Sequence, residues 1–309
     1  MVRQQSISDP RNASLTQNAS LTQNASPTHN ASLTQNAPPP HPPTPQSSQE
    51  GKQLVVSTSS QANHTGKSKS KDHHFAFDRV FGPSSTQEGV FEEISQLVQS
   101  ALDGYNICIF AYGQTGSGKT FTMEGGEAPE VRGMIPRAVQ QIFATAAEME
   151  AKGWQYSFEA SFLEIYQETI RDLLTADPAQ QADQKLEVKM VKGTSDVVVP
   201  GLTIQAVSTE EEVHDVLRRA AATRVTARTE MNERSSRSHS VFQLRINGTN
   251  ATSGDACTAT LNLIDLAGSE RVASSKAEGE RLEEAKAINK SLSSLGNVIM
   301  ALGNGVSWG

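Results

Sequence analysis

The sequence predicts an α/β fold in which helices flank a central mixed β-sheet. Apolar residues recur at helical spacing in some stretches and at strand spacing in the stretches between them, so helices and strands interleave along the chain. A second observation is the short apolar run Tyr105–Tyr112, which is followed at once by a glycine-rich loop. This order of buried strand, loop and helix is typical of sheets that bind phosphate groups at one edge.

Periodicity and end signals predict the individual elements. Val90–Leu102 carries one apolar stripe and is followed by Gly104, a residue that commonly ends helices. Thr209 and Glu212 have the spacing of a capping box, which satisfies backbone N–H groups of a first helical turn. The predicted helices are Val90–Leu102, Ile135–Met149, Thr209–Thr223 and Glu278–Leu302. The predicted strands are Tyr105–Tyr112, Trp154–Tyr166, Leu186–Met190, Val197–Ile204, Ser240–Ile246 and Thr258–Ile264.

Residues 1–71 are predicted to be a disordered low-complexity tail, and residues 72–309 a partial folded domain. The tail repeats NASLTQ with a six-residue period and then becomes proline-rich. A β-solenoid would give such a period, but one leucine per repeat buries too little apolar surface to offset the entropy of ordering. The Asn-Ala-Ser triplets fit the N-glycosylation pattern, which would require a secretory signal that the sequence does not predict.

The composition excludes several classes of function and location. The chain has 309 residues, two cysteines and a formal net charge of −7. An acidic chain lacks the overall basic footprint of nucleic-acid-binding proteins, so we expect no nucleic-acid partner. Cys108 and Cys257 are too few for a disulfide framework and are expected to be reduced thiols. We find no apolar run long enough to cross a bilayer, so we expect no membrane insertion and an intracellular location.

Gly113–Thr120 reads GQTGSGKT and fits the phosphate-loop pattern G-x-x-x-x-G-K-[ST]. Its glycines let backbone N–H groups turn inward around a β-phosphate, Lys119 adds a positive charge, and Thr120 offers a hydroxyl to Mg²⁺. The alternative is a glycine-rich turn that only connects strand to helix, which the eight matching positions disfavour. The predicted nucleotide-binding residues of the loop are Gly113, Gln114, Thr115, Gly116, Ser117, Gly118, Lys119 and Thr120.

Two later segments make the predicted site more specific. Asn232–His239 reads NERSSRSH and precedes a predicted strand; alone, it is compatible with an ordinary solvated serine-rich loop. Asp265–Glu270 reads DLAGSE and follows a predicted buried strand, the place where phosphate-loop enzymes put the acid that organises Mg²⁺. The alternative for Asp265 is a turn or cap acid. Gly268 has the D-x-x-G spacing, so its backbone N–H can approach a γ-phosphate.

Together GQTGSGKT, NERSSRSH and DLAGSE resemble the phosphate loop, switch I and switch II of the kinesin superfamily. FLEIY at Phe162–Tyr166 and INKSLSSL at Ile288–Leu295 are also similar to kinesin heads, and the resemblance covers about residues 72–303. VQSALDGY, FTMEGG and MIPR look most like the minus-end-directed, C-terminal-motor class. The resemblance implies a kinesin-like P-loop NTPase fold. It also implies a microtubule-dependent ATPase motor that uses ATP and Mg²⁺ in the cytoplasm, on microtubules or the spindle.

The resemblance also assigns roles to individual residues. Asn232 would contact the nucleotide, Asp265 would act on the metal through water, and Arg237 and Glu270 would form the ion pair that closes switch I onto switch II. Glu270 would also help to take a proton from the attacking water. The catalytic candidates are Ser235, Arg237, Gly268 and Glu270, and the metal candidates are Thr120, Ser236 and Asp265.

Basic residues in or near Glu278–Leu302 are candidate contacts to tubulin, since kinesins lay this helix against the acidic microtubule surface. An ordinary solvated helix face, balanced by neighbouring glutamates, is an equal alternative for any one of them. These residues are Arg271, Lys276, Arg281, Lys286 and Lys290.

The chain also departs from the kinesin pattern. No R-x-R-P-like opening segment precedes Phe75, and the chain ends soon after INKSLSSLGNVIMAL. We therefore expect a sheet that is incomplete at both edges and an isolated 309-residue chain that aggregates. The alternative function is a truncated head that binds nucleotide or tubulin without productive turnover. Dimerisation is expected only if a coiled-coil stalk exists outside this chain, because residues 1–70 show no heptads.

Overall fold

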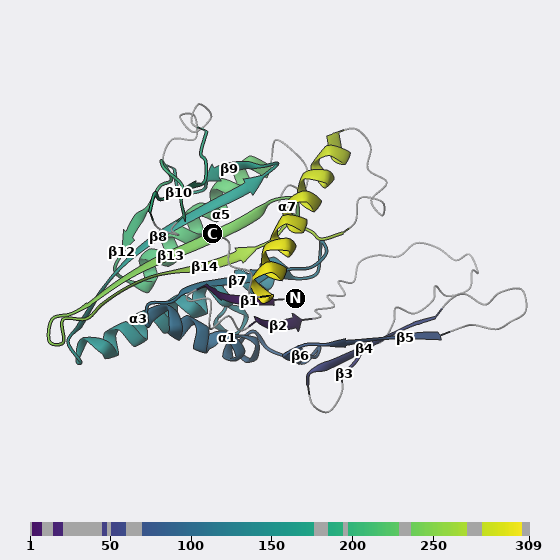
Figure 1. Cartoon of the computed structure of the whole chain (residues 1–309), viewed down its shortest axis with the longest axis horizontal. Helices are drawn as coiled ribbons and strands as arrows, with labels where there is room; N and C mark the ends of the chain where they lie inside the picture. Colours follow the sequence, from purple (N-terminus) through teal and green to yellow (C-terminus); the bar gives the residue numbers. More distant parts are fainter. Residues whose placement is uncertain are drawn as a thin grey trace, which may run out of the picture.

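The computed structural model describes residues 2–7, 15–20, 45–47, 51–59, 70–175, 185–193, 197–228, 236–270 and 280–304. Their centre is a nine-stranded sheet with the strand order β12-β8-β13-β14-β7-β1-β2-β6 and with β9 beside β8. Helices lie on both faces of this sheet (Figure 1). The predicted α/β fold with a central mixed sheet is therefore confirmed.

Four long or buried strands form the middle of the sheet. β8 (Trp154–Tyr166) and β13 (His239–Asn250) run antiparallel, and β13 pairs in the same way with β14 (Ala256–Asp265). β14 then runs parallel to β7 (Asn106–Ala111), with Leu261 opposite Ile107. Because β7 and β14 are parallel neighbours, their carboxyl ends lie at the same edge of the sheet. Each of these four strands lies where the sequence predicts it, within a few residues at each end.

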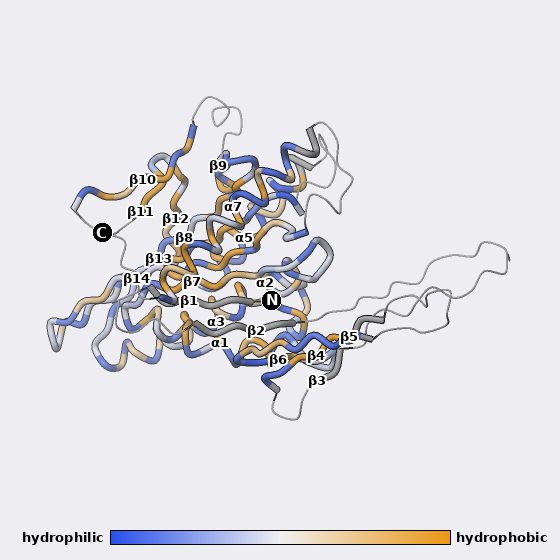
Figure 2. Tube along the Cα trace, turned by 45° about the vertical axis from the view of Figure 1, so that its right-hand side comes forward, coloured by the Kyte–Doolittle hydropathy of each residue, from blue (hydrophilic) through white to orange (hydrophobic). Residues whose placement is uncertain are grey.

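Three helices cover one face of the sheet and enclose the main core. These are α1 (Gln87–Leu102), α3 (Met134–Glu150) and α5 (Glu210–Arg228). Their apolar stripes bury the side chains of alternate strand residues, among them Phe162 on β8 and Phe242 on β13, whose rings meet edge to face at 5.8 Å. Figure 2 shows hydrophobic segments concentrated where these elements meet. Burial of this face gives the helices most of their stability.

The ends of α1 and α5 follow the signals that the sequence carries. The Thr86 hydroxyl accepts a hydrogen bond from Gly89 N at the start of α1, and Gly104 takes a left-handed φ of 98° just beyond its end. At the start of α5 the Thr209 hydroxyl accepts from Glu212 N at 3.2 Å, which confirms the predicted capping box. The Glu212 carboxylate reaches back to Ser208 N at 2.6 Å.

Helix α7 (Glu280–Gly303) lies on the opposite face of the sheet from α1 (Figure 1). It contacts His239, whose side chain points away from the face to which Phe242 belongs because strand residues alternate. Ile299 is its most deeply buried apolar side chain. The structure agrees with the predicted helix Glu278–Leu302 over its described length. Among the described residues, no helix combines the length and apolarity needed to span a membrane.

Five strands lie within or next to the segment predicted to be disordered. They are β1 (Val2–Ile7), β2 (Leu15–Ser20), β3 (Pro45–Ser47), β4 (Gln53–Ser59) and β5 (Ser70–Ala76). β1 pairs antiparallel with both β7 and β2, while β3, β4 and β5 form a separate three-stranded sheet. The structure thus differs from the disorder predicted for residues 1–71 wherever it describes them. The physical reason is that an open strand edge is satisfied by backbone hydrogen bonds, which need little apolar side-chain surface.

Short strands account for the other differences from the predicted elements. The predicted strands Leu186–Met190 and Val197–Ile204 shrink to β10 (Lys189–Met190) and β11 (Val197–Val198), which pair with each other. Runs of two to four residues contain too few positions to show alternation. Sequence analysis therefore missed β6 (Arg79–Phe81), β9 (Thr169–Asp172) and β12 (Gln205–Val207).

The turn before α3 offers a stability prediction. Gly125 has a left-handed φ of 74°, and a Cβ there would overlap Gly133 N and lie 2.7 Å from the carbonyl carbon of Arg132. Left-handed strain and backbone overlap together predict that Gly125→Ala lowers the free energy of unfolding by about 2–4 kcal/mol. The matched control is Gly254→Ala, where φ is 79° but no atom lies within 4 Å; strain alone predicts a loss of about 1–2 kcal/mol. Equal losses in chemical denaturation would contradict the role given to the overlap.

Candidate active site

The phosphate loop and the DLAGSE segment lie side by side because β7 and β14 end together. Leu266 N donates a hydrogen bond to Ala111 O at 3.2 Å, and Ser269 N donates to Gly113 O at 3.0 Å. These bonds continue the pairing of the two strands beyond their ends. Residues more than 150 positions apart in the sequence therefore line the same edge of the sheet, as the sequence predicted.

The loop has the backbone geometry that its glycines allow. Gly116 and Gly118 have φ values of 77° and 87°, in the left-handed region, and Gly118 is the N-cap of α2 (Lys119–Met123). A loop of this shape, ending in a helix N-terminus, presents backbone N–H groups to an anion. The geometry fits the predicted binding of phosphate by Gly113–Thr120.

Lys119 lies within this loop, half-buried. Its Nζ donates to the backbone carbonyl of Gln114 at 3.1 Å. Burial lowers the pKa of the Lys119 ammonium, and the nearby carboxylates of Asp265 and Glu270 oppose that shift. A phosphate at the loop would add negative charge beside the ammonium and favour its charged form.

Thr120 and Asp265 meet across the two loops. The Thr120 hydroxyl donates to Asp265 Oδ2 at 2.5 Å, and Asp265 is 8% exposed. Burial raises the pKa of Asp265, while the hydrogen bond from Thr120 and the charge of Lys119 lower it. The other oxygen, Asp265 Oδ1, is buried and has no hydrogen-bond partner among the residues that the structure describes.

The Thr120 hydroxyl and the Asp265 carboxylate together suit a magnesium ion. Magnesium prefers hard oxygen ligands and keeps several waters, so it needs only one or two protein groups together with phosphate oxygens. Within the described ranges, no three His, Cys, Asp or Glu side chains gather to hold a metal on their own. Asp265 Oδ1 is buried and unpaired among the described residues, and the Thr120 hydroxyl lies beside this carboxylate. These two groups fit a magnesium ion that is also bound by the phosphates of a nucleotide. Ser236 adjoins this region through its backbone carbonyl, which accepts from Gly268 N at 2.7 Å.

Glu270 turns back onto the phosphate loop. Its carboxylate accepts from Thr115 N at 2.9 Å and from the Thr115 hydroxyl at 2.5 Å. Burial acts to raise the pKa of Glu270, but the hydrogen bonds from Thr115 and the charge of Lys119 outweigh it, and the pKa falls below its usual value. Glu270 is therefore held as a carboxylate. A Cβ at Gly268 would overlap both the Glu270 carboxylate and the Thr115 hydroxyl, so any larger residue there would displace these two side chains.

Arg237 has a different partner from the one expected. Its Nη1 donates to Glu284 Oε2 on α7 at 2.6 Å, instead of pairing with Glu270. Glu284 is almost buried and also accepts from the Tyr166 hydroxyl at 2.8 Å. The expected Arg237–Glu270 pair is not formed in this arrangement, because Arg237 is bonded to Glu284 and Glu270 to Thr115. Sequence analysis missed Glu284, which looks like one more surface glutamate of an amphipathic helix.

Several predicted site residues lie outside the described residues: Asn232, Ser235, Arg271 and Lys276. The side chain of Arg281 is likewise not described. The two remaining tubulin candidates are exposed and make surface ion pairs, Lys286 with Glu283 at 2.6 Å and Lys290 with Glu168 at 3.5 Å. Such pairs contribute little stability, which leaves both lysines available to a partner.

His239 is a site residue that the sequence signalled only as the last letter of NERSSRSH. Its Nδ1 accepts from Ala267 N at 3.0 Å, so Nε2 carries the proton and donates to the Ser291 hydroxyl at 2.9 Å. His239 therefore links switch II to α7. Burial lowers the pKa of His239 to about 4, with the charge of Glu168 opposing and that of Lys119 reinforcing the shift.

The depressed pKa of His239 predicts a pH dependence. Between about pH 6.5 and pH 4 the unfolded chain binds a proton at this position and the folded chain does not. The free energy of unfolding should therefore fall as the pH is lowered through this window, by about 3 kcal/mol in total. His239→Gln should show a shallower fall than wild type in denaturant titrations between pH 4 and 7, whereas His214→Gln on α5 is the control. Parallel curves for wild type and His239→Gln would contradict this account.

Comparison with known proteins identifies the family. Residues 38–307 match the kinesin motor domain, which is most of the chain. The chain belongs to the kinesin family. This kinesin is 51% identical to mouse kinesin-like protein KIFC1 over 274 residues, which are 86% of the chain and 41% of KIFC1. It is 54% identical to carboxy-terminal kinesin 2 of Xenopus laevis over 265 residues, 83% of the chain and 40% of that protein. The chain spans about two fifths of these relatives.

Solved kinesin structures share its fold. The motor domain of the kinesin-like protein Kar3 of Saccharomyces cerevisiae matches with a TM-score of 0.68 and 42% identity, over 85% of this chain and 75% of Kar3's. A structure titled as that of a fast kinesin matches with a TM-score of 0.72 and 40% identity, over 86% and 74% of the two chains. The predicted resemblance to the kinesin family, including its C-terminal motors, is confirmed, and nucleotide binding follows from the family.

Proposed function

We propose that this kinesin hydrolyses ATP at the phosphate-loop site and couples hydrolysis to microtubule binding and movement. One observation carries the proposal: the phosphate loop, switch I and switch II meet at one edge of the sheet. Thr120 contacts Asp265, and Gly268 N contacts the carbonyl of Ser236. Phosphoryl transfer depends mainly on positioning and on charge neutralisation, and this edge provides the groups for both.

Each residue of the site has a role in binding or catalysis that follows from its position. Lys119 and the loop N–H groups would hold the phosphates, Thr120 and Ser236 would hold Mg²⁺, and Asp265 would act on the metal through water. When bound, the metal neutralises charge that develops on the phosphate oxygens. For catalysis, Gly268 N leaves the Ser236 carbonyl and turns to the γ-phosphate. The remaining assignments are unchanged from the sequence: nucleotide contact by Asn232, γ-phosphate or water contact by Ser235, and switch closure by Arg237 with Glu270.

Relatives and helix α7 support the microtubule part of the proposal. The relatives named above are kinesins, and α7 presents exposed Lys286 and Lys290 on the surface. An acidic tubulin surface attracts such charges. We therefore place the protein on cytoplasmic microtubules or the spindle, as a motor of the minus-end-directed class. A solved structure joins the C-terminal motor and motor homology domain of Kar3Vik1 to a synthetic heterodimeric coiled coil, an arrangement compatible with dimerisation through a stalk outside this chain.

The test is phosphate release from ATP by soluble, folded protein, with and without polymerised tubulin. We expect turnover that rises with tubulin concentration to a plateau. The alternative, a head that binds without turnover, predicts nucleotide binding in a fluorescent-nucleotide titration and no phosphate release above background. Failure to bind nucleotide at all would contradict both functions.

A further inference from the structure

We propose that Arg224 is a positioning residue that fixes α2, the helix of the phosphate loop, against α5, the helix that leads into switch I. It would thereby set the separation of two candidate magnesium ligands, Thr120 after the phosphate loop and Ser236 in switch I. The inference rests on the proposed function, because it concerns the magnesium–nucleotide site on which that function depends.

Arg224 lies near the end of α5, with its guanidinium largely shielded from solvent. Its Nη2 donates to the carboxylate of Glu124 at 2.5 Å, and the two side chains are 14% and 26% exposed. The guanidinium carbon also lies 5.3 Å from the centre of the Phe162 ring, which belongs to the main core. A cation that is held between a carboxylate and an aromatic ring, away from water, is fixed more firmly than one in an exposed ion pair.

Glu124 carries this contact to the phosphate loop. It is the C-cap of α2, and its backbone N–H donates to the carbonyl of Thr120 at 2.8 Å. α2 is only five residues long, and so short a helix takes its orientation from the contacts at its ends. The position of Thr120 therefore depends on the ion pair one turn further along the chain.

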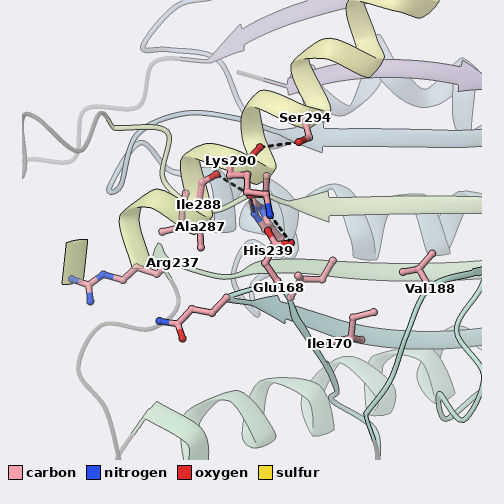
Figure 3. A pocket seen from close by; sticks show the side chains of 12 residues that line it. Glu168, Ile170, Val188, Arg237, His239, Ala287, Ile288, Lys290 and Ser294 are labelled. Atoms are coloured by element: carbon pink, nitrogen blue, oxygen red, sulfur yellow. Dashed lines mark hydrogen bonds and ion pairs between the residues drawn. The ribbon is translucent and has the colours of Figure 1, made fainter. Parts of the chain in front are cut away.

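α5 carries the same contact to switch I. Arg224 lies one turn before Arg228, the last residue of α5, and the NERSSRSH segment follows. On the opposite face of the sheet, beside α7, switch I is packed less closely: Arg237 and His239 line a cavity of about 340 Å³ (Figure 3). Because that side leaves room for movement, the placement of switch I depends more on α5.

A second ion pair joins the loop after α2 to the other end of α5. Arg132 Nη1 lies 3.5 Å from Glu210 Oε1, and both side chains are about one-third exposed. Glu210 begins α5, and Arg224 lies about 21 Å further along the helix. The pair at Glu210 is therefore remote from switch I along the helix. It should stabilise the loop slightly without placing the magnesium ligands.

The variant Arg224→Gln tests this role through nucleotide binding to soluble, folded protein. A fluorescent ADP analogue is titrated with Mg²⁺ present and again with EDTA, and the ratio of the two affinities is the magnesium gain. In EDTA we expect the affinity to stay within about twofold of wild type, because the loop still holds the phosphates. The magnesium gain should fall about tenfold, since outer partners that orient metal ligands typically contribute about 10–100-fold in metal affinity.

Matched variants complete the design. Glu124→Gln removes the same ion pair from its other side and should lose the gain as well, which decides the question if Arg224→Gln does not fold. The double variant Arg224→Gln/Glu124→Gln should be no worse than Arg224→Gln alone, because one contact cannot be lost twice. Arg224→Lys keeps the charge but not the planar group over Phe162, so it should recover part of the gain. Arg132→Gln, the control, should keep the wild-type gain.

The outcomes separate this inference from the proposed function. Folded Arg224→Gln or Glu124→Gln with the wild-type magnesium gain would overturn the role of Arg224. Equal losses of affinity in Mg²⁺ and in EDTA would show a general defect of the fold and would also overturn it, as would the same loss in Arg132→Gln. Wild-type protein that shows the magnesium gain but releases no phosphate from ATP would contradict the proposed ATPase, while the binding data would still decide the role of Arg224.

Discussion

Replacing Lys119 with Ala should abolish nucleotide binding at micromolar concentrations. Lys119 is the lysine of the phosphate loop, and its Nζ now rests on the carbonyl of Gln114, ready to exchange that neutral acceptor for phosphate oxygens. Charge-assisted hydrogen bonds contribute about 1.5–3 kcal/mol each, so losing contacts to two phosphates predicts an affinity loss of about 10²–10⁴-fold. The measurement is a fluorescent-nucleotide titration.

The control for this substitution is Lys152→Ala, which removes an exposed lysine from the turn after α3. It should bind nucleotide like wild type. Melting temperatures without nucleotide should be similar for both variants, because among the described residues the Lys119 ammonium bonds to the carbonyl of Gln114 and to no carboxylate. Wild-type affinity of a folded Lys119→Ala variant would refute the assignment of the phosphate loop.

Glu270→Ala should leave ATP binding within a few fold of wild type and reduce turnover by about 10²–10³-fold. An interaction made mainly in the closed, reacting arrangement acts on kcat more than on binding, and a positioned acid–base group contributes about 10²–10⁴-fold. Steady-state phosphate release with saturating microtubules measures the loss. Glu127→Ala, at an exposed surface carboxylate, is the control.

Arg237→Ala should lower turnover in the same way, but this variant should also lower the stability of the fold. Removing Arg237 leaves the buried Glu284 with Tyr166 as its remaining described donor, so this variant should also be less stable than Glu270→Ala. The comparison is informative in itself: a lower melting temperature for Arg237→Ala supports the contact with α7. Microtubule-stimulated turnover at the wild-type rate in either variant would refute the closing pair.

The sequence predicted well those elements that are long enough to show a hydrophobic period or that carry a local signal such as a helix cap. The strand Trp154–Tyr166 was predicted with its observed bounds, and the Thr209 cap lies where its spacing placed it. The sequence also placed Asp265 at the end of a buried strand that contributes to the phosphate-loop site, but it did not give the parallel pairing of β14 with β7. The partner of Arg237 could not be predicted, because several glutamates are within reach of a long side chain and only tertiary burial selects Glu284. The pairing of β1 with β7 was also beyond prediction, since its side chains carry no apolar pattern.

The parallel pairing of β7 and β14 has a consequence for folding of the protein during its synthesis. Asn106 accepts a hydrogen bond from Thr260, 154 positions later in the chain. During synthesis at about 5–20 residues per second, the phosphate loop waits roughly 8–30 s for Asp265 and its strand to be made. Until then the phosphate loop lacks Asp265, so a nucleotide binds well only to chains in which β14 has already been made and folded. At one hundred times its dissociation constant, a nucleotide would add about 2.7 kcal/mol to the completed fold. Cellular ATP would then act by mass action on the maturation of this kinesin as well as on its activity.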